Sequence, residues 1–379
     1  MSLSIHKIES LQDVPATDWN NLVPDDNPFL RHEFLAGLER YKCLDEHGWY
    51  PAHILAYTGD KLAGALPLYI KTNSVGEFVF DWSWAEAYEQ TGRQYYPKLV
   101  SAIPFTPVTG PRCLVNQQTI NKGEISKQIY NAARQFAEDS NISSLHYLFP
   151  DEVEQLQLAS DGLLIRKACQ YFWFNHHYQD FGEFLQTLNS KKRKQLKMER
   201  RTIINTGIEL EILHGAEITS RHWAIYHQFY RSTFYRKWGD PRFTLPFFES
   251  LSRTMPDATL LFMAKYKNEY VAGAFAMKGT ETLYGRHWGC NNQFKFLHFE
   301  LCYYQTIEYC IQHGLKKLDA GVQGEHKISR GFVPATTWSA HWIANEQFRS
   351  AVQDFLDREQ QYIEGYMNEL STHLAYKSI

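Results

Sequence analysis

The sequence lacks the long apolar segments and the cysteine patterns of membrane-spanning and secreted proteins. No run of about 20 apolar residues occurs, so no transmembrane helix is expected. The first residues, MSLSIHKIES, contain no apolar core of a secretory signal. The six cysteines form no CxxC pair and no framework typical of disulfides. We therefore expect a reduced, cytoplasmic protein.

Several short motifs of common nucleotide-binding and hydrolytic sites are also missing. Because neither GxxxxGK[ST] nor a GxGxxG after a strand occurs, P-loop and dinucleotide-binding folds are not expected. The absence of GxSxG and HExxH argues against an α/β-hydrolase and a zincin. A zinc site is suggested only by His287, Cys290, His298 and Cys302. Their spacing matches no common zinc site, so we predict no metal and no tightly bound cofactor.

The composition that remains is globular and rich in aromatic rings. Hydrophobic residues make up 44% and charged residues 21%, which excludes long disorder. The net charge of -3 excludes a wholesale polyanion binder but leaves room for a local basic patch. Aromatic residues reach 15%, enough for large cores or ring-lined grooves. The 379 residues exceed one ordinary domain and suit two.

A weak internal repeat relates the two halves of the sequence. The segment that begins at Tyr57, YTGDKLAGAL, resembles the segment that begins at Tyr266, YKNEYVAGAF. Each predicts two strands joined by a short polar turn, with Ala-Gly-Ala in the second strand. A Phe-rich helix is expected before each hairpin, and a helix followed by a strand after it. Chance similarity of two short hairpins is the alternative.

The repeat predicts a mixed α/β protein with mainly antiparallel sheets and two related domains. We place these domains at residues 1–178 and 179–379. The first copy carries an insertion at about residues 75–115 that is dense in rings, proline and glycine. Since its prolines exclude a long helix or a central strand, it is either a packed loop or an aromatic wall for an extended substrate. In the second case, Tyr96 and Lys98 would approach the substrate.

A basic segment lies near the expected boundary between the domains. Residues 191–201 contain seven basic residues and one acid. Leu188, Leu196 and Ile203 recur at roughly helical spacing, which predicts a helix over about 184–205 with one apolar seam. The basic face is either a solvated linker or a site for phosphates of RNA, CoA or a lipid headgroup. The candidate anion-binding residues are Lys192, Arg193 and Lys197.

The densest polar cluster is DAGVQGEHKISRGFVP, residues 319–334, directly after a predicted strand. Its glycines allow tight turns. Glu325 and His326 could accept a proton, while Lys327 and Arg330 could hold an anion. Loops at strand ends often carry function, so this segment is the leading site candidate, with a hydrophilic surface loop as the alternative.

A second polar cluster covers residues 283–302. In its predicted strand, Arg286 and Trp288 fall on one face and His287 on the other. The helix that follows is expected to open with His298 and Glu300. We therefore add these five side chains to the candidate site.

The longest of these segments resemble one known family. DWSWAEAYEQTGRQYYPKLVSAIPFTPVTGPR, LYGRHWG, LHFELCYYQTIEYCIQHGL and GVQGEHKISRGFVP are similar to the FemAB-like proteins, bacterial members of the GNAT N-acyltransferase superfamily associated with peptidoglycan biosynthesis or recognition. The resemblance covers nearly the whole chain and implies two tandem GNAT-like domains. Ordinary GNAT enzymes bind CoA pyrophosphate on a Q/R-x-x-G-x-G/A loop. GCNNQFKFLHF departs from that pattern, which leaves the acyl donor open between acyl-CoA and aminoacyl-tRNA.

The resemblance implies an N-acyltransferase that acylates an amine, in a small molecule or a cell-wall precursor. A base and an oxyanion donor would assist the attack of the amine on the donor carbonyl. Glu325 or His326 is the expected base, with His287 in the same catalytic group. The expected substrate contacts are Lys327, Arg330, Arg286, Trp288, Tyr96, Lys98, His298 and Glu300. A non-catalytic binder of a cell-wall precursor and an RNA-binding protein remain alternatives, and the oligomeric state is open.

Overall fold

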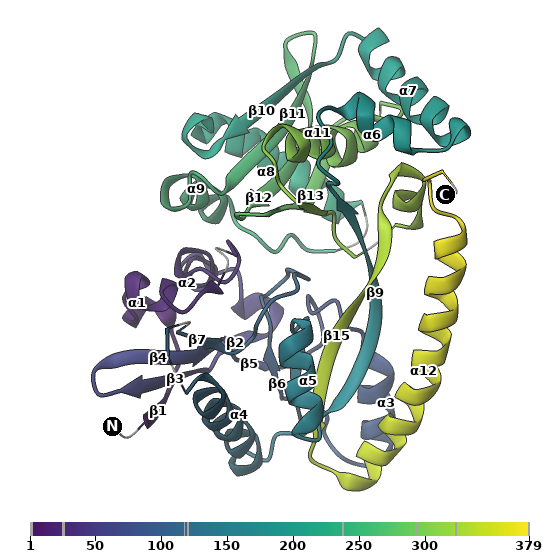
Figure 1. Cartoon of the computed structure of the whole chain (residues 1–379). Helices are drawn as coiled ribbons and strands as arrows, with labels where there is room; N and C mark the ends of the chain where they lie inside the picture. The colour runs from purple at the N-terminus through teal and green to yellow at the C-terminus, as the bar shows by residue number, and fades with distance from the viewer. Residues whose placement is uncertain are drawn as a thin grey trace. The chain divides into compact units, whose positions relative to one another are not determined.

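The computed structural model describes residues 3–24, 27–116, 118–119, 121–236, 239–292, 294–322 and 324–377, and it divides into two compact units (Figure 1). Unit 1 comprises Met1–Cys169 and Thr336–Gly365, and unit 2 comprises Gln170–Ala335 and Tyr366–Ile379. None of the helices in the described ranges is long and apolar enough to cross a membrane.

Unit 1 contains two groups of strands and the helices that cover them. One sheet has the order β1 (Leu3–Ile8), β3 (His53–Thr58), β4 (Lys61–Leu66), β7 (Leu114–Val115). The other strands have the order β15 (Val333–Ile343), β8 (Ser144–Leu148), β6 (Lys98–Ser101), β5 (Tyr69–Lys71), β2 (Trp49–Pro51). The helices are α1 (Ala16–Asn20), α2 (His32–Arg40), α3 (Trp82–Gln90), α4 (Lys122–Asp139), α5 (Glu152–Ser160) and the first part of α12 (Glu346–Thr372).

Unit 2 is built around six strands in the order β10 (Glu209–His214), β11 (Thr259–Tyr266), β12 (Glu269–Lys278), β13 (Thr282–Cys290), β14 (Lys317–Asp319), β9 (Leu164–Phe174). Its helices are α6 (Phe181–Thr187), α7 (Ser190–Asn205), α8 (Ser220–Tyr235), α9 (Leu245–Thr254), α10 (Leu297–Phe299) and α11 (Gln305–Gln312). A π-helix (Glu300–Tyr304) joins α10 to α11, and a 3₁₀-helix (Glu325–Arg330) follows β14.

Both predicted hairpins are present and share one irregularity. β3 pairs antiparallel with β4 and β11 with β12, and the register shifts at Ala56/Tyr57 in the first pair and at Ala264/Lys265 in the second. A β-carbon on Gly64 would lie 2.8 Å from Ile129 of α4, and one on Gly273 would lie 2.7 Å from the Met263 sulfur. A side chain at the central position of either Ala-Gly-Ala would therefore clash with its neighbours, and glycine avoids the clash.

The fold class predicted from the sequence is confirmed, because both units are mixed α/β and most of their strand pairs are antiparallel. The extent of the units differs from the predicted division at residues 178 and 179. Residues 336–365 return to unit 1, where β15 pairs antiparallel with β8 from Ser339 to Ile343. A long-range strand pair of this kind leaves no local pattern in the sequence.

Candidate active site

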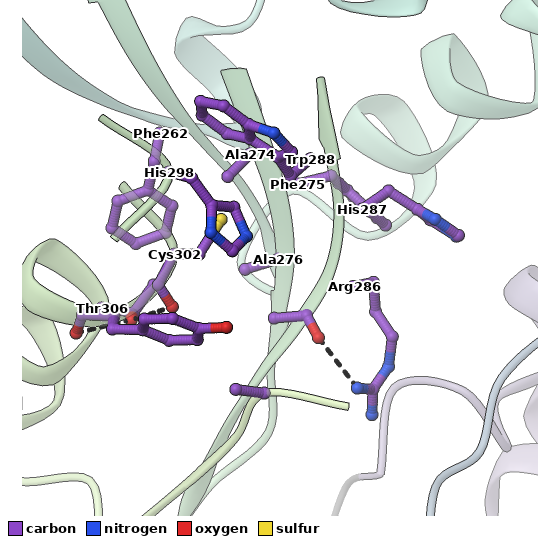
Figure 2. A pocket seen from close by; sticks show the side chains of 13 residues that line it. Phe262, Ala274, Phe275, Ala276, Arg286, His287, Trp288, His298, Cys302 and Thr306 are labelled. Atoms are coloured by element: carbon purple, nitrogen blue, oxygen red, sulfur yellow. Dashed lines mark hydrogen bonds between the residues drawn. The ribbon is translucent and has the colours of Figure 1, made fainter. Parts of the chain in front are cut away.

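A small pocket of about 90 Å³, partly open to solvent, lies in unit 2 where two parallel strands diverge. β13 and β14 pair in parallel from Thr282↔Lys317 to Tyr284↔Asp319. β14 then ends, whereas β13 continues to Cys290. Gly285 of β13 and Ala320, which directly follows β14, both line the pocket. The other lining residues are Phe262, Ala274, Phe275, Ala276, Arg286, His287, Trp288, His298, Cys302, Tyr303 and Thr306 (Figure 2).

A β-bulge in β13 sets the directions of the predicted strand residues. Phe275 pairs with His287 and Ala276 with Gly285, so Arg286 is the extra residue. The strict alternation predicted for Arg286, His287 and Trp288 is therefore interrupted. Trp288 contacts the His298 ring edge-on at 5.3 Å, while His287 points away from His298 (Figure 2). Bulges commonly re-aim side chains next to functional sites.

His287 is enclosed by aromatic rings, among them those of Tyr230 and Phe243. Burial, with a smaller contribution from the Arg286 charge, lowers the pKa of His287 to about 3. Its Nε2 has no hydrogen-bond partner within the described part of the chain. An imidazole with so low a pKa is a poor base near pH 7, and the catalytic role predicted for His287 stays a prediction.

Arg286 and Asp319 connect the two diverging strands. The Nη1 and Nη2 atoms of Arg286 lie 3.4 Å and 3.1 Å from the two carboxylate oxygens of Asp319. Arg286 Nη1 also donates to the Gly285 carbonyl at 2.9 Å, and the Gly321 N–H donates to Asp319 Oδ1 at 2.9 Å. Asp319 is therefore part of the scaffold that holds the strand ends at the pocket.

The π-helix supplies Cys302 and Tyr303 to the pocket wall. The Tyr303 hydroxyl lies 2.9 Å from His326 Nε2, and the His298 and His326 ring centres are 6.2 Å apart. His326 is exposed, but partial desolvation and the charges of Arg330 and Lys327 lower the pKa of its imidazole. His326 is therefore neutral at pH 7 and able to accept a proton. Short π-helical segments inside helices are frequent at functional sites.

Cys302 is better explained by packing than by reactivity. Burial raises the pKa of its thiol, so the thiolate is scarce at neutral pH. The described residues also contain no group of three His, Cys, Asp or Glu side chains placed to hold a metal ion.

The segment after β14 turns sharply, as its glycines predict. Gly324 has φ +111° and Gly331 has φ +88°, and a β-carbon on Gly331 would also lie 2.8 Å from the Phe184 ring. Lys327 is 1% exposed, and its Nζ donates to the carbonyls of Ala320 and Gly321 at 2.8 and 2.6 Å. Burial lowers the pKa of Lys327 to about 8, against the opposing effect of Asp319.

Arg330 is likewise turned inward. It is 3% exposed, and its Nη2 lies 3.0 Å from both carboxylate oxygens of Glu199 on α7. Its Nε donates to the Tyr304 hydroxyl at 3.1 Å, and its guanidinium lies 3.5 Å from the centre of the Phe299 ring. The anion-binding role expected for Lys327 and Arg330 stays a prediction, since the contacts of both side chains are with other groups of the protein.

His326, Lys327 and Arg330 are not among the residues that line the pocket, and the same holds for Glu325, Glu300 and Lys98. Glu325 is exposed and accepts a hydrogen bond of 2.7 Å from the Tyr366 hydroxyl. Glu300 is 2% exposed and pairs with Arg200 of α7 at 3.2 Å. Lys98 belongs to unit 1 and is described below.

The basic segment is helical, with Leu196 and Ile203 buried, but the helix predicted over about 184–205 is interrupted. α6 ends at Thr187, Leu188 is extended, and α7 begins at Ser190 after the N-cap Asn189. Lys192 Nζ donates to Ser329 Oγ at 2.7 Å, which places the start of α7 beside the 3₁₀-helix. Arg193 is half-buried and Lys197 is exposed. The basic segment and the glycine-rich segment therefore meet within unit 2, although they lie far apart in the sequence.

Tyr96 and Lys98 take part in a buried polar cluster of unit 1. Lys98 is fully buried, and its Nζ donates to Ser74 Oγ at 2.8 Å, Glu77 Oε2 at 2.8 Å and Asp81 Oδ2 at 2.5 Å. Ser74 Oγ also bonds the hydroxyl of half-buried Tyr96 at 2.8 Å. The substrate contacts expected for Tyr96 and Lys98 stay predictions.

Two histidines complete this cluster. His146 Nδ1 and His341 Nδ1 lie 2.6 Å apart, so the N–H of one ring donates a hydrogen bond to the unprotonated nitrogen of the other. Burial lowers the pKa of His146 to about 3 and that of His341 well below its usual range. Burial also raises the pKa of Glu77 to about 7, against the opposing charge of Lys98.

These shifts predict how stability depends on pH. Between about pH 5 and 6.5 both histidines are protonated only when unfolded, whereas Glu77 is protonated only when folded. Of these three groups taken together, the unfolded state then binds one proton more than the folded state. Their combined contribution to stability should fall by roughly 1.4 kcal/mol per pH unit as the pH decreases, and His287 of unit 2, whose pKa is about 3, adds a slope of the same sign. Glu77→Gln removes the opposing proton, so its acid slope should be steeper by a further 1.4 kcal/mol per unit or so. Urea unfolding at several pH values measures both slopes, and equal slopes would contradict the assignment.

Three residues that lie at or behind the pocket were not predicted as site residues. Tyr303 is not among the expected residues, although it carries the hydroxyl that contacts His326. Asp319 bridges the strands, and Glu199 neutralises Arg330. For Glu199, the only indication in the sequence was that it is the single acidic residue within the basic segment of residues 191–201.

Comparison with known proteins identifies relatives of the whole chain. The sequence profile of the FemAB-like family, described as peptidoglycan biosynthesis/recognition, matches residues 10–378. The crystal structure of FemX is similar over 93% of this chain and 100% of that chain, with 12% identity and a TM-score of 0.56. L-PGS from Bacillus licheniformis is similar over 85% and 90%, with 11% identity and a TM-score of 0.53. At such identities the structural likeness shows the fold alone. No curated protein matches the sequence.

Proposed function

The chain belongs to the FemAB-like family of peptidoglycan biosynthesis and recognition proteins, and from this premise we propose that it is an N-acyltransferase whose active site is the pocket of unit 2. It transfers an acyl or aminoacyl group from a thioester or ester donor to an amine of a cell-wall precursor. The observation that carries the proposal is the contact of Tyr303, which lines the pocket, with His326, an exposed residue outside the lining.

The strand divergence suits an extended acyl donor. Among the described residues, β14 ends at Asp319, so the later part of β13 has no strand beside it on that side. A chain with amide groups, such as a pantetheine arm, can bond to a strand edge of this kind. The rings of Trp288 and His298, which contact each other and both line the pocket, would contact it there.

The proton transfer follows from the position of His326. The amine nitrogen attacks the carbonyl carbon of the donor, and the carbonyl oxygen becomes an oxyanion. Neutral His326 accepts the proton that the nitrogen must lose, directly or through the Tyr303 hydroxyl. The tetrahedral intermediate then expels the thiolate or ribose oxygen, which takes up a proton. The new amide bond replaces the thioester or ester bond, and no metal is needed for the balance.

The test is a transfer assay read by mass spectrometry. A cell-wall peptide precursor with a free amine is incubated with the protein and either acyl-CoA or a mixture of aminoacyl-tRNAs. The proposal expects the precursor to gain the mass of the acyl group. Binding of the precursor without a mass gain from either donor would contradict transfer and favour a recognition protein on the same fold.

The exposed face of α7 predicts the donor. Lys194, Lys197 and Arg201 are exposed and spaced by three and four residues, so they share one ridge of the helix. We expect tRNA to bind this ridge with an affinity that falls steeply with salt, and free acetyl-CoA to bind with a Kd of about 100 μM or weaker. Changing the three residues to Glu should weaken tRNA binding at least tenfold.

Two controls sharpen the donor prediction. Lys7→Glu reverses a single charge at an exposed residue of unit 1, as each of the three substitutions does on α7, and should leave tRNA affinity unchanged. Calorimetry with acetyl-CoA gives the opposing result: low-micromolar binding that is insensitive to the three substitutions would restore an ordinary CoA-dependent enzyme.

A further inference from the structure

The π-helix of unit 2 is held at both ends by two consecutive residues of α7. Glu300 is its first residue and Tyr304 its last. Arg200 Nε lies 3.2 Å from Glu300 Oε1, and the Tyr304 hydroxyl donates to Glu199 Oε2. The two residues of the π-helix that line the pocket, Cys302 and Tyr303, lie between these two attachments.

Both attachments are extended by further charged partners. Arg200 Nη2 lies 2.7 Å from Glu308 Oε2 on α11, so Arg200 joins the π-helix to the helix that follows it. Glu199 is 2% exposed and receives both contacts of Arg330 described above. A buried carboxylate with an arginine and a tyrosine as donors is fixed in position, because removing any partner leaves a desolvated charge.

The geometry of α7 explains how neighbouring residues reach two points. Successive residues of an α-helix differ in direction by about 100°. Leu196 and Ile203 are buried and seat the helix, so Glu199 and Arg200 are directed to the two sides of this seam. Arg200 therefore forms ion pairs within the protein, whereas Arg201 is exposed.

We propose that Glu199 and Arg200 form a clamp that fixes the π-helix and so positions Tyr303 and His326 at the pocket. Both are positioning residues, since neither lines the pocket. The clamp rests on the proposed function only for its effect on turnover, and its effect on the π-helix is independent of any reaction. It also gives a specific role to the one acid within the basic segment.

Hydrogen exchange of the peptide that spans residues 297–312 tests the clamp directly. Arg200→Ala should speed exchange of the π-helix amides about tenfold or more, and Arg201→Ala is the matched control that should leave it unchanged. Arg200→Lys retains the charge and should restore part of the protection, because lysine can meet one carboxylate but not both in the same geometry. Equal exchange in Arg200→Ala and the wild-type protein would overturn the clamp.

Glu199→Gln gives a second, independent readout. It should raise exchange at the Tyr304 end more than at the Glu300 end, and uniform acceleration across the whole of unit 2 would contradict a local clamp. In the transfer assay, Arg200→Ala should lower kcat at least tenfold with little change in the KM for the donor, whereas loss of a phosphate contact would raise that KM. If no donor supports transfer, the proposed function fails, but the exchange result still decides the clamp.

Discussion

Replacing His326 by alanine is expected to lower the rate of acyl transfer by about 10²–10⁴-fold, the usual contribution of a positioned general base. The imidazole is neutral at pH 7 because partial desolvation and two nearby cations lower its pKa, so it can take the proton of the attacking amine. Tyr303→Phe removes the hydroxyl that contacts His326 Nε2 and should lower the rate by a smaller factor. Steady-state kinetics at fixed donor concentration measures both effects.

Glu325 provides the discriminating control, because the sequence offers it as an equal candidate for the base. Glu325→Gln keeps the size of the side chain and can still accept a hydrogen bond from Tyr366. We expect this variant to retain most of its activity. A loss of two orders of magnitude in Glu325→Gln, with His326→Ala nearly unaffected, would transfer the role of the base to Glu325.

Replacing Lys98 by methionine is expected to lower the stability of unit 1 by about 3–5 kcal/mol, because Glu77 and Asp81 would lose their shared buried cation. All three side chains are at most 3% exposed, so water cannot replace the lost interaction without local opening. For a unit of this size the loss corresponds to a fall in Tm of roughly 6–20 °C. Thermal unfolding followed by circular dichroism measures it.

Two variants separate this effect from a general loss of charge. Lys7 forms an exposed pair with Glu9, and Lys7→Met should change stability by at most about 0.5 kcal/mol. Combining Lys98→Met with Glu77→Gln and Asp81→Asn removes the stranded charges and should recover part of the stability. A triple variant less stable than Lys98→Met alone would show that the carboxylates are stabilised by something other than Lys98.

The sequence determined the elements of the fold and the location of the candidate site along the chain. The two Ala-Gly-Ala hairpins, the basic helix over residues 190–205 and the tight turns at Gly324 and Gly331 follow from local patterns. Such patterns are readable because propensity, periodicity and glycine conformation act between residues that are close in sequence. Arg286, Trp288 and His298, expected from the sequence at one site, all line one pocket, and their contact with a substrate stays a prediction.

Only the tertiary structure decided which charges are available at the pocket and which are used within the protein. Arg330 and Glu199 are 131 residues apart in the sequence, yet they form a buried pair, and Lys98 meets two carboxylates of a preceding loop. The bulge at Arg286 and the π-helix at Glu300–Tyr304 likewise depend on the strands and helices packed against them. The physical reason is that a charged side chain must find a partner when it is desolvated, and that partner is chosen by proximity in space rather than along the chain.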